Sequence, residues 1–468
     1  MTNYIVNSPQ TLLTGTTSND LFVLDTALAV SVYGIDGADV FTGSAVIYNQ
    51  SILNGGAGND TIGWTALGSA TRASVLGGAG SDLITGGFIS TAASTLIQGG
   101  GDNDTILLTA GIGANSGGGT ASTLNGNGGN DLIGFSASGV TNSLIALGGG
   151  ADTISGTFNN FNTSTLIGGG GADLISASIS AGGTASVIAG DTNSTLTEFD
   201  GNDSIFIASA SSFAVGLVQG GGGADLITIE GLGSATTVGG NGGSDTITLS
   251  AVGGATRSIV NLGGDADVFS GNFLAAGNQD QTINGGDGND TITLSAAANA
   301  TLLVTSYTFG EAGADEITLN NTAFSTSTTL NSLGYANASQ SNLSAFDTVS
   351  GNNGNGFSVA EFYLNATTAG DTAQGSTITA TNGRVSFSNT FALGVTARAA
   401  AIDTLTPTKG AVSFFNDGLG RSYLFVQGGA AGTSDDLLIQ GGSGQQFTAI
   451  TVAGIGAGLP GSKIGITF

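Results

Sequence analysis

Thirteen aspartates recur along the chain at intervals of 20 to 30 residues, and their carboxylates are the groups best suited to bind a ligand. They are Asp39, Asp60, Asp82, Asp104, Asp131, Asp152, Asp173, Asp203, Asp225, Asp245, Asp267, Asp290 and Asp315. Most of them close a glycine-rich run and precede a small apolar pair, as in residues 55–62 (GGAGNDTI). Ca²⁺ takes six to eight oxygen ligands, from carboxylates and backbone carbonyls, at about 2.3–2.6 Å. The repeat therefore predicts structural calcium sites, each built from one of these aspartates and the carbonyl groups of a glycine turn.

The spacing of the aspartates also predicts the architecture. Glycine reaches the positive φ angles of a sharp turn without strain, and the apolar residue two places after each Asp fits the period of a strand. An interval near 22 residues fits a coil with one Asp turn, a strand, a second turn and a returning strand such as residues 94–97 or 164–167. The longer intervals predict insertions at the second turn, over residues 110–121 and 189–199. We expect an all-β fold, a parallel β-solenoid that places the aspartates in one column.

Three regions differ in composition. Residues 1–33 predict an N-terminal cap or atypical coil, residues 34–350 the calcium-binding solenoid, and residues 351–468 a smaller C-terminal β domain. The last region has alternating segments at 383–387 and 411–415, which are typical of antiparallel strands.

The charge is concentrated in the repeats. The chain carries a net charge of −26, with 27 acidic and 2 basic residues in 1–350 but 6 and 5 in 351–468. Carboxylates stacked about 4.8 Å apart repel by about 1–4 kcal/mol per pair, which is large beside the roughly 5–15 kcal/mol that stabilises a whole domain. A bound cation reverses this repulsion, so we expect folding to require calcium. Phosphate backbones would repel such a chain, which excludes nucleic acid as a partner.

The pattern leaves a second interpretation of the aspartates open. Asp and Asn side chains can cap the turns of a solenoid by accepting hydrogen bonds from backbone N–H groups, with no metal present. Six further aspartates are candidates for second calcium ligands or for solvated charges. They are Asp36, Asp102, Asp191, Asp200, Asp265 and Asp287.

Catalysis is poorly supported by the composition. The chain has no His and no Cys, which excludes Ser-His-Asp triads, cysteine nucleophiles and His-based zinc sites. A polysaccharide-acting β-helix needs a basic residue near its carboxylates, but Arg72 and Arg257 are the only basic residues of the repeats and we expect both on the surface. We therefore expect that the protein is not an enzyme.

Other residue types suggest packing and location. Trp64, Phe158, Phe161 and Phe206 are expected in the core, with an exposed cluster at 158–161 as the alternative. No run approaches the roughly 18 apolar residues of a membrane span. The first basic residue is Arg72, so the N-terminus lacks the charged start of a signal peptide.

The glycine-aspartate turns over residues 34–320 resemble RTX, or haemolysin-type calcium-binding, repeats. That resemblance implies a protein that leaves a Gram-negative-type bacterium by type I secretion, with an uncleaved C-terminal signal, and folds in external calcium. Residues 423–439 and the apolar strand 464–468 are similar to the C-terminal segments of such proteins. The 22-residue period and the low charge content more closely resemble the S-layer members of this superfamily.

These expectations combine into two functional hypotheses. The first is a secreted, calcium-dependent structural protein that assembles with copies of itself into an S-layer or an extracellular filament. The second is a monomeric adhesin or biofilm-matrix protein that binds a cell-surface glycan, lipopolysaccharide or another surface.

Overall fold

The computed structural model describes residues 2–467 except for 8–11, 26–29, 44–45, 48–49, 68–71, 89–94, 110–111, 114–121, 180–185, 192–200, 214–215, 234, 253–256, 274–281, 297–306, 310–312, 322–331, 336–340, 342–344, 346, 352–356, 362–366, 369–371, 375–377, 382, 389–392, 406–407, 429–434 and 455–461. The chain forms two compact units, residues 1–242 and residues 243–468. We call them unit 1 and unit 2 and describe each by itself.

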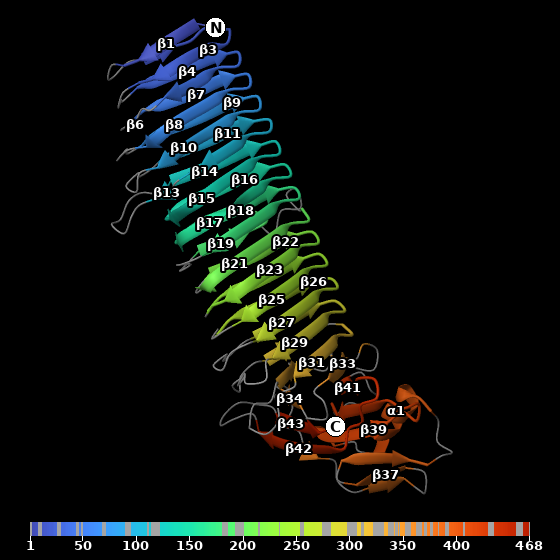
Figure 1. The fold of residues 1–468 in the computed structure, drawn as a ribbon. Helices are drawn as coiled ribbons and strands as arrows, with labels where there is room; N and C mark the ends of the chain where they lie inside the picture. Colours follow the sequence, from blue (N-terminus) through green and yellow to red (C-terminus); the bar gives the residue numbers. More distant parts are fainter. Residues whose placement is uncertain are drawn as a thin grey trace. The chain divides into compact units, whose positions relative to one another are not determined.

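Unit 1 is a stack of coils that build two parallel sheets (Figure 1). Sheet A contains β1 (Thr2–Val6), β3 (Asp20–Leu24), β5 (Val40–Gly43), β6 (Val46–Ile47), β8 (Thr61–Leu67), β10 (Leu83–Phe88), β12 (Thr105–Leu108), β13 (Ile112–Gly113), β15 (Leu132–Thr141), β17 (Thr153–Asn162), β19 (Leu174–Ile179), β21 (Ser204–Phe213) and β23 (Leu226–Leu232). Sheet B contains β2 (Leu12–Thr14), β4 (Ser31–Asp36), β7 (Ile52–Ala57), β9 (Ser74–Ala79), β11 (Leu96–Gly101), β14 (Ser122–Gly128), β16 (Ser143–Gly149), β18 (Thr165–Gly170), β20 (Ser186–Ala189), β22 (Gly216–Gly222) and β24 (Thr237–Gly242). Successive coils pair in parallel in both sheets, which confirms the predicted β-solenoid.

Successive side chains of a strand point to opposite faces, so every second residue of sheet A and of sheet B points into the core between the two sheets. The residue two places after each Asp points inward, and these residues stack directly across the coils. Ile62, Ile84, Ile106 and Ile133 are paired in this way and are at most 1 % exposed. Full burial of one such side chain contributes about 1.5–3 kcal/mol, so every coil adds a similar increment to the core.

Glycine turns join each strand of sheet B to the next strand of sheet A. Gly56 and Gly58 have φ angles of 111° and 119°, in the left-handed region that other residues reach only with strain. A Cβ on Gly56 would also collide with the carbonyl oxygen of Ile35 in the preceding coil. Close stacking of coils and sharp turning therefore both require glycine here.

The predicted insertion at 110–121 lies largely outside the described residues; only Ile112 and Gly113 are described, and they form β13 of sheet A. The prediction for 189–199 is wrong. Residues 192–200 lie outside the described residues, but in sequence they come between β20 of sheet B and β21 of sheet A, which is where an aspartate turn and not a second turn is expected.

Unit 2 begins with further coils of the same kind. Its parallel strands on the Asp side are β25 (Thr246–Val252), β27 (Val268–Phe273), β29 (Thr291–Ala296), β31 (Glu316–Asn321) and β33 (Asp347–Gly351). The strands on the other side are β26 (Ile259–Gly264), β28 (Thr282–Asp287), β30 (Tyr307–Phe309), β32 (Ser332–Tyr335) and β34 (Phe357–Glu361).

The C-terminal strands cover the last coil. β41 (Leu437–Gly441) pairs in parallel with β33, and β43 (Ser462–Thr467) pairs antiparallel with β34 and with β42 (Ala449–Gly454). An unpaired strand edge can pair with another chain. By pairing with β33 and β34, the strands β41 and β43 cover the edges of the last coil of unit 2.

The rest of the C-terminal region is a small mixed domain. Its other strands are β35 (Thr367–Thr368), β36 (Thr372–Gln374), β37 (Ile378–Thr381), β38 (Arg384–Phe387), β39 (Ala411–Asn416) and β40 (Ser422–Val426). Antiparallel pairing from β36 to β38 and from β39 to β41 agrees with the alternation in the sequence. The helix α1 (Val395–Leu405) was not predicted; its Ala399 and Ile402 pack against Phe415 in the core.

The aromatic predictions are confirmed for three residues and wrong for one. Trp64 is buried and donates its Nε1–H to the Gly87 carbonyl, and Phe158 and Phe161 are fully buried, so the alternative of an exposed cluster there is wrong. Phe206 was expected in the core but lies on the outward face of sheet A, 38 % exposed, because it stands an odd number of residues after Asp203.

The two basic residues of the repeats, Arg72 and Arg257, are exposed as expected. In the part of the chain that the structure describes, no helix is long and apolar enough to cross a membrane.

Candidate metal centre

The thirteen predicted aspartates occupy the same position in the coils of each unit, just before a strand of sheet A in unit 1 or a strand on the Asp side in unit 2. All are at most 4 % exposed, so their side chains point into the interior of the turn. Two further aspartates, Asp20 and Asp347, extend the column by one coil in each unit. No glycine-rich run directly precedes Asp20 or Asp347, so their position in the coil identifies them as members.

One carboxylate oxygen of each aspartate has a fixed partner. Within each unit the backbone N–H of one Asp donates to Oδ1 of the Asp in the next coil: from Asp20 to Asp225 at 2.6–2.8 Å in unit 1 and from Asp245 to Asp347 at 2.7–3.1 Å in unit 2. Asparagine at the preceding position makes a second ladder, as when Asn59 Oδ1 accepts from the Ser81 N–H at 3.1 Å. Backbone capping by a side-chain ladder, the second interpretation of the sequence, is therefore present.

The other carboxylate oxygen is different. Oδ2 of Asp60 and Oδ2 of Asp82 are buried and accept no hydrogen bond from the described residues. A Cβ on Gly55 would collide with Oδ2 of Asp60 and with the carbonyl oxygen of Gly77 in the next coil, so both oxygen atoms lie close to the Gly55 Cα. The same pairing of a carboxylate oxygen and a carbonyl oxygen recurs beside five more glycines. They are Gly15, Gly34, Gly77, Gly126 and Gly190.

This environment makes the carboxylates hard to ionise in the absence of a cation. Burial raises the pKa of Asp60 to about 7, and the neighbouring charges of Asp82 and Asp39 add to the rise although the Asp39 N–H opposes it. Burial likewise raises the pKa of Asp173 to about 8 and that of Asp315 to about 7. A raised pKa marks a group that is destabilised as an anion.

The N-terminal end of the column shows how the fold satisfies a carboxylate without a metal. Oδ2 of Asp20 accepts hydrogen bonds from the Thr16 N–H at 2.7 Å and the Thr16 hydroxyl at 2.9 Å. Oδ1 accepts from the Thr2 N–H at 3.0 Å. Burial alone would raise the pKa of Asp20, but these bonds from Thr16 and Thr2 hold it below its usual value. At the other end, the Asp347 N–H donates to the Ser341 hydroxyl at 2.9 Å, which takes the place of a further aspartate.

Of the candidate second ligands that the structure describes, only Asp191 is buried. Asp36, Asp102, Asp265 and Asp287 are exposed, and Asp200 lies outside the described residues. Asp191 is 5 % exposed, and its Oδ2 accepts from the Gly222 N–H at 3.0 Å.

The donor set fits a hard cation. Within the described residues, no group of three or more acidic side chains converges on one point, so a metal here would combine single carboxylates with backbone carbonyl oxygens. Both are oxygen donors of the kind that Ca²⁺ accepts in flexible geometry, and there is no nitrogen or sulfur donor that would select zinc. The residues that would hold Ca²⁺ are the aspartates of the column together with backbone carbonyl groups of the glycine turns, such as the Gly77 carbonyl beside Asp60, and a bound ion would neutralise the buried charge.

The sequence interpretation missed a second ladder, on the opposite edge of the coils. Buried hydroxyl residues stand directly before, or at the first position of, several strands of sheet B and β26 of unit 2: Ser51, Thr95, Ser122, Ser143, Ser164, Ser186, Thr236 and Ser258. The Ser143 N–H donates to the Ser164 hydroxyl at 3.2 Å, and the Val30 N–H donates to the Ser51 hydroxyl at 3.2 Å. The signal is the repeated Ser or Thr before an apolar pair, as in residues 164–167.

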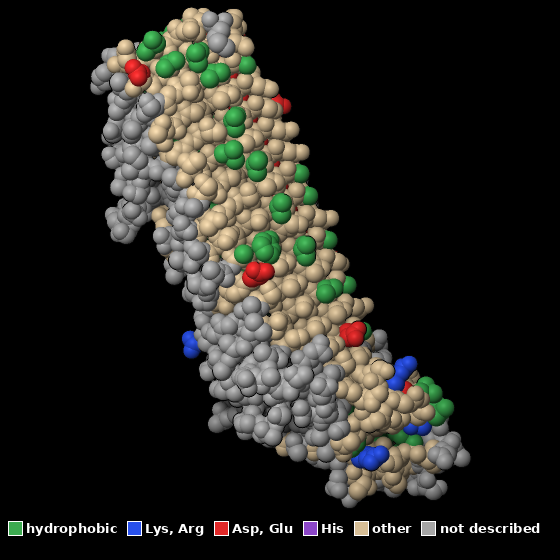
Figure 2. Space-filling model, viewed as in Figure 1, with side chains coloured by type: hydrophobic (Ala, Val, Ile, Leu, Met, Phe, Trp, Pro, Cys, Tyr) green, Lys and Arg blue, Asp and Glu red, His purple; other side chains and the backbone are tan. Residues whose placement is uncertain are grey.

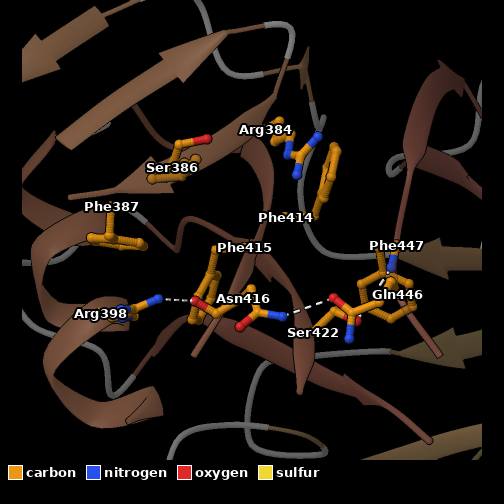
Figure 3. Close-up of a pocket in the computed structure, with 11 residues that line it drawn as sticks. Arg384, Ser386, Phe387, Arg398, Phe414, Phe415, Asn416, Ser422, Gln446 and Phe447 are labelled. Carbon is orange, nitrogen blue, oxygen red and sulfur yellow. Dashed lines mark hydrogen bonds between the residues drawn. The ribbon is translucent and has the colours of Figure 1, made fainter. Parts of the chain in front are cut away.

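The C-terminal region holds a cavity of about 190 Å³ between β38, β39 and the turn before β42. Figure 3 shows Arg384 beside Phe414 at its upper side and Arg398 beside Phe387 at its lower side. The Arg398 guanidinium lies 4.7 Å from the centre of the Phe387 ring and also donates to the Asn416 carbonyl. The Asn416 amide donates to the Gln446 side chain at 2.7 Å across the cavity. Two cations, amides and aromatic rings thus line one concave surface.

No protein-family model matches this sequence, and no curated protein or solved structure is significantly similar to it.

Proposed function

We propose that this protein is a secreted, calcium-dependent structural protein that assembles with copies of itself on or outside the cell, as a surface layer or an extracellular filament. The observation that carries the proposal is a set of buried carboxylates whose Oδ2 atoms lie beside a carbonyl oxygen and accept no hydrogen bond from the described residues: Asp39, Asp60, Asp82, Asp131 and Asp203. A buried carboxylate oxygen without a hydrogen-bond donor is costly as an anion unless a proton or a cation accompanies it.

Calcium is the cation that fits an extracellular protein of this composition. The turns supply oxygen ligands only, and the chain has no cysteine with which to form disulfides as an alternative means of stabilisation. Metal binding would couple to folding because the glycine turns that supply the carbonyl groups form only in the stacked coils.

The resemblance of residues 34–320 to RTX repeats supports the location. A chain that stays unfolded at low intracellular calcium can be threaded through a type I secretion channel and then folds outside. The uniform coils support a structural role because repeats of this kind present long regular surfaces.

A calcium titration of chelator-treated protein tests the proposal, with circular dichroism and negative-stain electron microscopy on the same samples. We expect β signal and ordered assemblies to form together in millimolar calcium. A β signal that is complete in the chelator and unchanged by calcium would overturn the metal assignment. Folded, dispersed monomers at all protein concentrations would overturn the assembly.

The cavity of the C-terminal region favours a second candidate function, a surface or matrix adhesin that binds an anionic glycan. Arg384 is exposed at the cavity, where it can contact a carboxylate. Binding of uronic-acid oligosaccharides measured by calorimetry tests this candidate. Arg384→Ala should reduce the affinity at least tenfold, whereas Lys409→Ala, at an exposed lysine outside the cavity, should not change it.

A further inference from the structure

The outward faces of unit 1 carry a regular pattern that neither the calcium sites nor the core requires. On sheet A, the residue that follows each Asp points outward, and it alternates between an apolar and a hydroxyl side chain from one coil to the next. These residues, the A column, are Val40, Thr61, Leu83, Thr105, Leu132, Thr153, Leu174 and Ser204. The strand register pairs each with the next.

Sheet B shows the same alternation on the opposite side of the coils. Its outward residues, the B column, lie in the first half of each strand of sheet B. They are Ser31, Ile52, Ser74, Leu96, Thr123, Leu144, Thr165 and Val187. These residues are also paired directly across successive coils. Coils lie about 4.8 Å apart, so each column has one large apolar side chain about every 9.6 Å.

The two columns are out of phase. Where a coil carries Ile52 on sheet B it carries Thr61 on sheet A, and the next coil carries Ser74 and Leu83. The opposition continues without exception through the eight coils that end with Val187 and Ser204. It stops on both sides, because the coil before has Leu12 and Leu21 and the coil after has Leu217 and Leu226.

The apolar members are accessible. Leu83, Leu132, Leu144 and Leu174 are 36–43 % exposed, although each could have been a threonine like its neighbours. The polar members separate them along each column, although Leu107 and Phe206, two places after Thr105 and Ser204, are also exposed on sheet A. Figure 2 shows hydrophobic side chains in separate groups on one face of the molecule. A large continuous patch would bind other apolar surfaces without selection, whereas spaced patches match only a partner with the same spacing.

We propose that the partner is a second copy of this chain, and that the A column of one copy packs against the B column of the next with an axial offset smaller than one coil. This inference rests on the proposed self-assembly and names its interface. At each level one copy then presents a large side chain where the other presents a small one, over all eight coils. Neither column contains a charged residue, so the contact buries no unpaired charge.

The size of the contact is adequate for a stable interface. Eight coils of about 4.8 Å and about five residues of strand cover a footprint of roughly 600–700 Å² on each copy. Standard interfaces bury about 800 Å² of accessible surface per partner, which exceeds the flat footprint because surfaces are rough. Sheets pack face to face at about 10 Å when their strands are nearly aligned, and copies related by translation satisfy that condition.

An interface between two different faces does not close. Each copy keeps a free A column on one side and a free B column on the other, so growth continues in a row. Pairing of the A column of one copy with the A column of another would instead give a closed dimer. In such a dimer the B column makes no contact, so its alternation would not need to be out of phase with that of the A column.

Two triple variants and their mixture test the interface by sedimentation velocity and light scattering in calcium. Leu83→Glu/Leu132→Glu/Leu174→Glu disables the A column, and Ile52→Glu/Leu96→Glu/Leu144→Glu disables the B column. Each alone should be monomeric, and an equimolar mixture should form particles of about twice the 45.3 kDa chain, joined through the two intact columns. Leu419→Glu, at a leucine of unit 2 that is 61 % exposed, should assemble like the unsubstituted protein.

Three outcomes would overturn the inference. They are unchanged assembly of either variant, dimers of the B-column variant alone, and no pairing in the mixture. If the unsubstituted protein itself fails to assemble in calcium, the proposed function is wrong. If it assembles and the variants behave otherwise than expected, only the proposed interface is wrong. The glutamate variants must first give the calcium-dependent β signal that shows they fold. If they do not, Leu83→Thr/Leu132→Thr/Leu174→Thr gives the same test with threonine, which neighbouring coils already carry at this position.

Discussion

The two edges of the solenoid solve the same backbone problem with different side chains. At both edges a buried side chain before the strand accepts a hydrogen bond from the N–H of its counterpart in an adjacent coil: an aspartate before sheet A and a hydroxyl residue before sheet B. The hydroxyl then donates onward, as when Ser164 Oγ–H reaches the Asn162 carbonyl oxygen at 2.9 Å. Oδ2 of Asp60 has no proton to donate when ionised and lies beside a carbonyl oxygen.

The difference shows what the aspartates add. Because a serine can cap the strand, capping alone does not explain a charged residue in every coil of one edge. Burying an anion without a partner costs several kcal/mol, and the column repeats that cost. We infer that the aspartate edge serves a cation, and each prediction below tests whether the two edges behave differently.

Removal of calcium should have the largest effect. In a chelator at pH 8.5, above the pKa of about 8 of Asp173, we expect loss of most of the β signal, because the cost of burying the ionised carboxylates of the column exceeds the roughly 5–15 kcal/mol that stabilises a domain. The hydroxyl edge cannot compensate for this loss. Circular dichroism measures the loss, and magnesium at equal concentration is the control, since its strict octahedral geometry suits turn carbonyls poorly. Retention of the full signal in the chelator would show that the two edges are equivalent.

Acid should partly replace calcium. A carboxyl whose pKa is about 7 when folded and about 3.8 when unfolded binds more protons in the folded state, as for Asp60 and Asp203. The calcium-free fold should therefore lose stability as the pH rises from about 4 to about 7, by about 1.4 kcal/mol per pH unit for each such group. Urea unfolding in a chelator at pH 4.5 and pH 7.5 measures this slope. In calcium the order reverses, because protons compete with the metal.

Asp20 provides the internal contrast for the acid experiment. Its pKa is lowered by the bonds from Thr16 and Thr2, so its contribution is present at neutral pH and is lost as the pH falls below about 4. Asp20→Asn should therefore leave the rise in stability between pH 7.5 and pH 4.5 intact, whereas Asp60→Asn should reduce it.

Two substitutions of Asp60 separate its two oxygen atoms. Asp60→Asn keeps the acceptor for the Asp39 N–H and puts an N–H₂ donor beside the Gly77 carbonyl, so the calcium-free fold should gain about 1–2 kcal/mol while calcium affinity falls. Asp60→Ala leaves the buried Asp39 N–H without its acceptor and should cost about 1–3 kcal/mol in either condition. Urea unfolding with and without calcium measures both. Equal losses for the two variants in a chelator would contradict the role assigned to Oδ2.

Much of this architecture could be predicted from sequence, and the parts that could not share a cause. The Gly-Asp period fixed the coil and the column because glycine and aspartate occupy positions that few other residues can. The insertion at 192–200 was assigned to the wrong turn because the length of an interval between aspartates does not show which of its two turns is longer. Phe206 was misassigned because residue type was given more weight than its odd distance from Asp203. The phase between the A and B columns was visible in the sequence, but it has meaning only once the register places the two columns on opposite faces.

Substitution in the hydroxyl edge should have the smallest effect and no calcium dependence. Ser164→Ala removes the acceptor of the Ser143 N–H and the donor to Asn162, so we expect a loss of about 1 kcal/mol. The loss should be the same in calcium and in low-pH, calcium-free buffer, because no charge is involved. Ser164→Thr is the matched control, since Thr95 and Thr236 occupy the equivalent position in other coils. If Ser164→Ala changed the calcium midpoint of folding as strongly as Asp60→Asn does, the metal would not be confined to the aspartate edge.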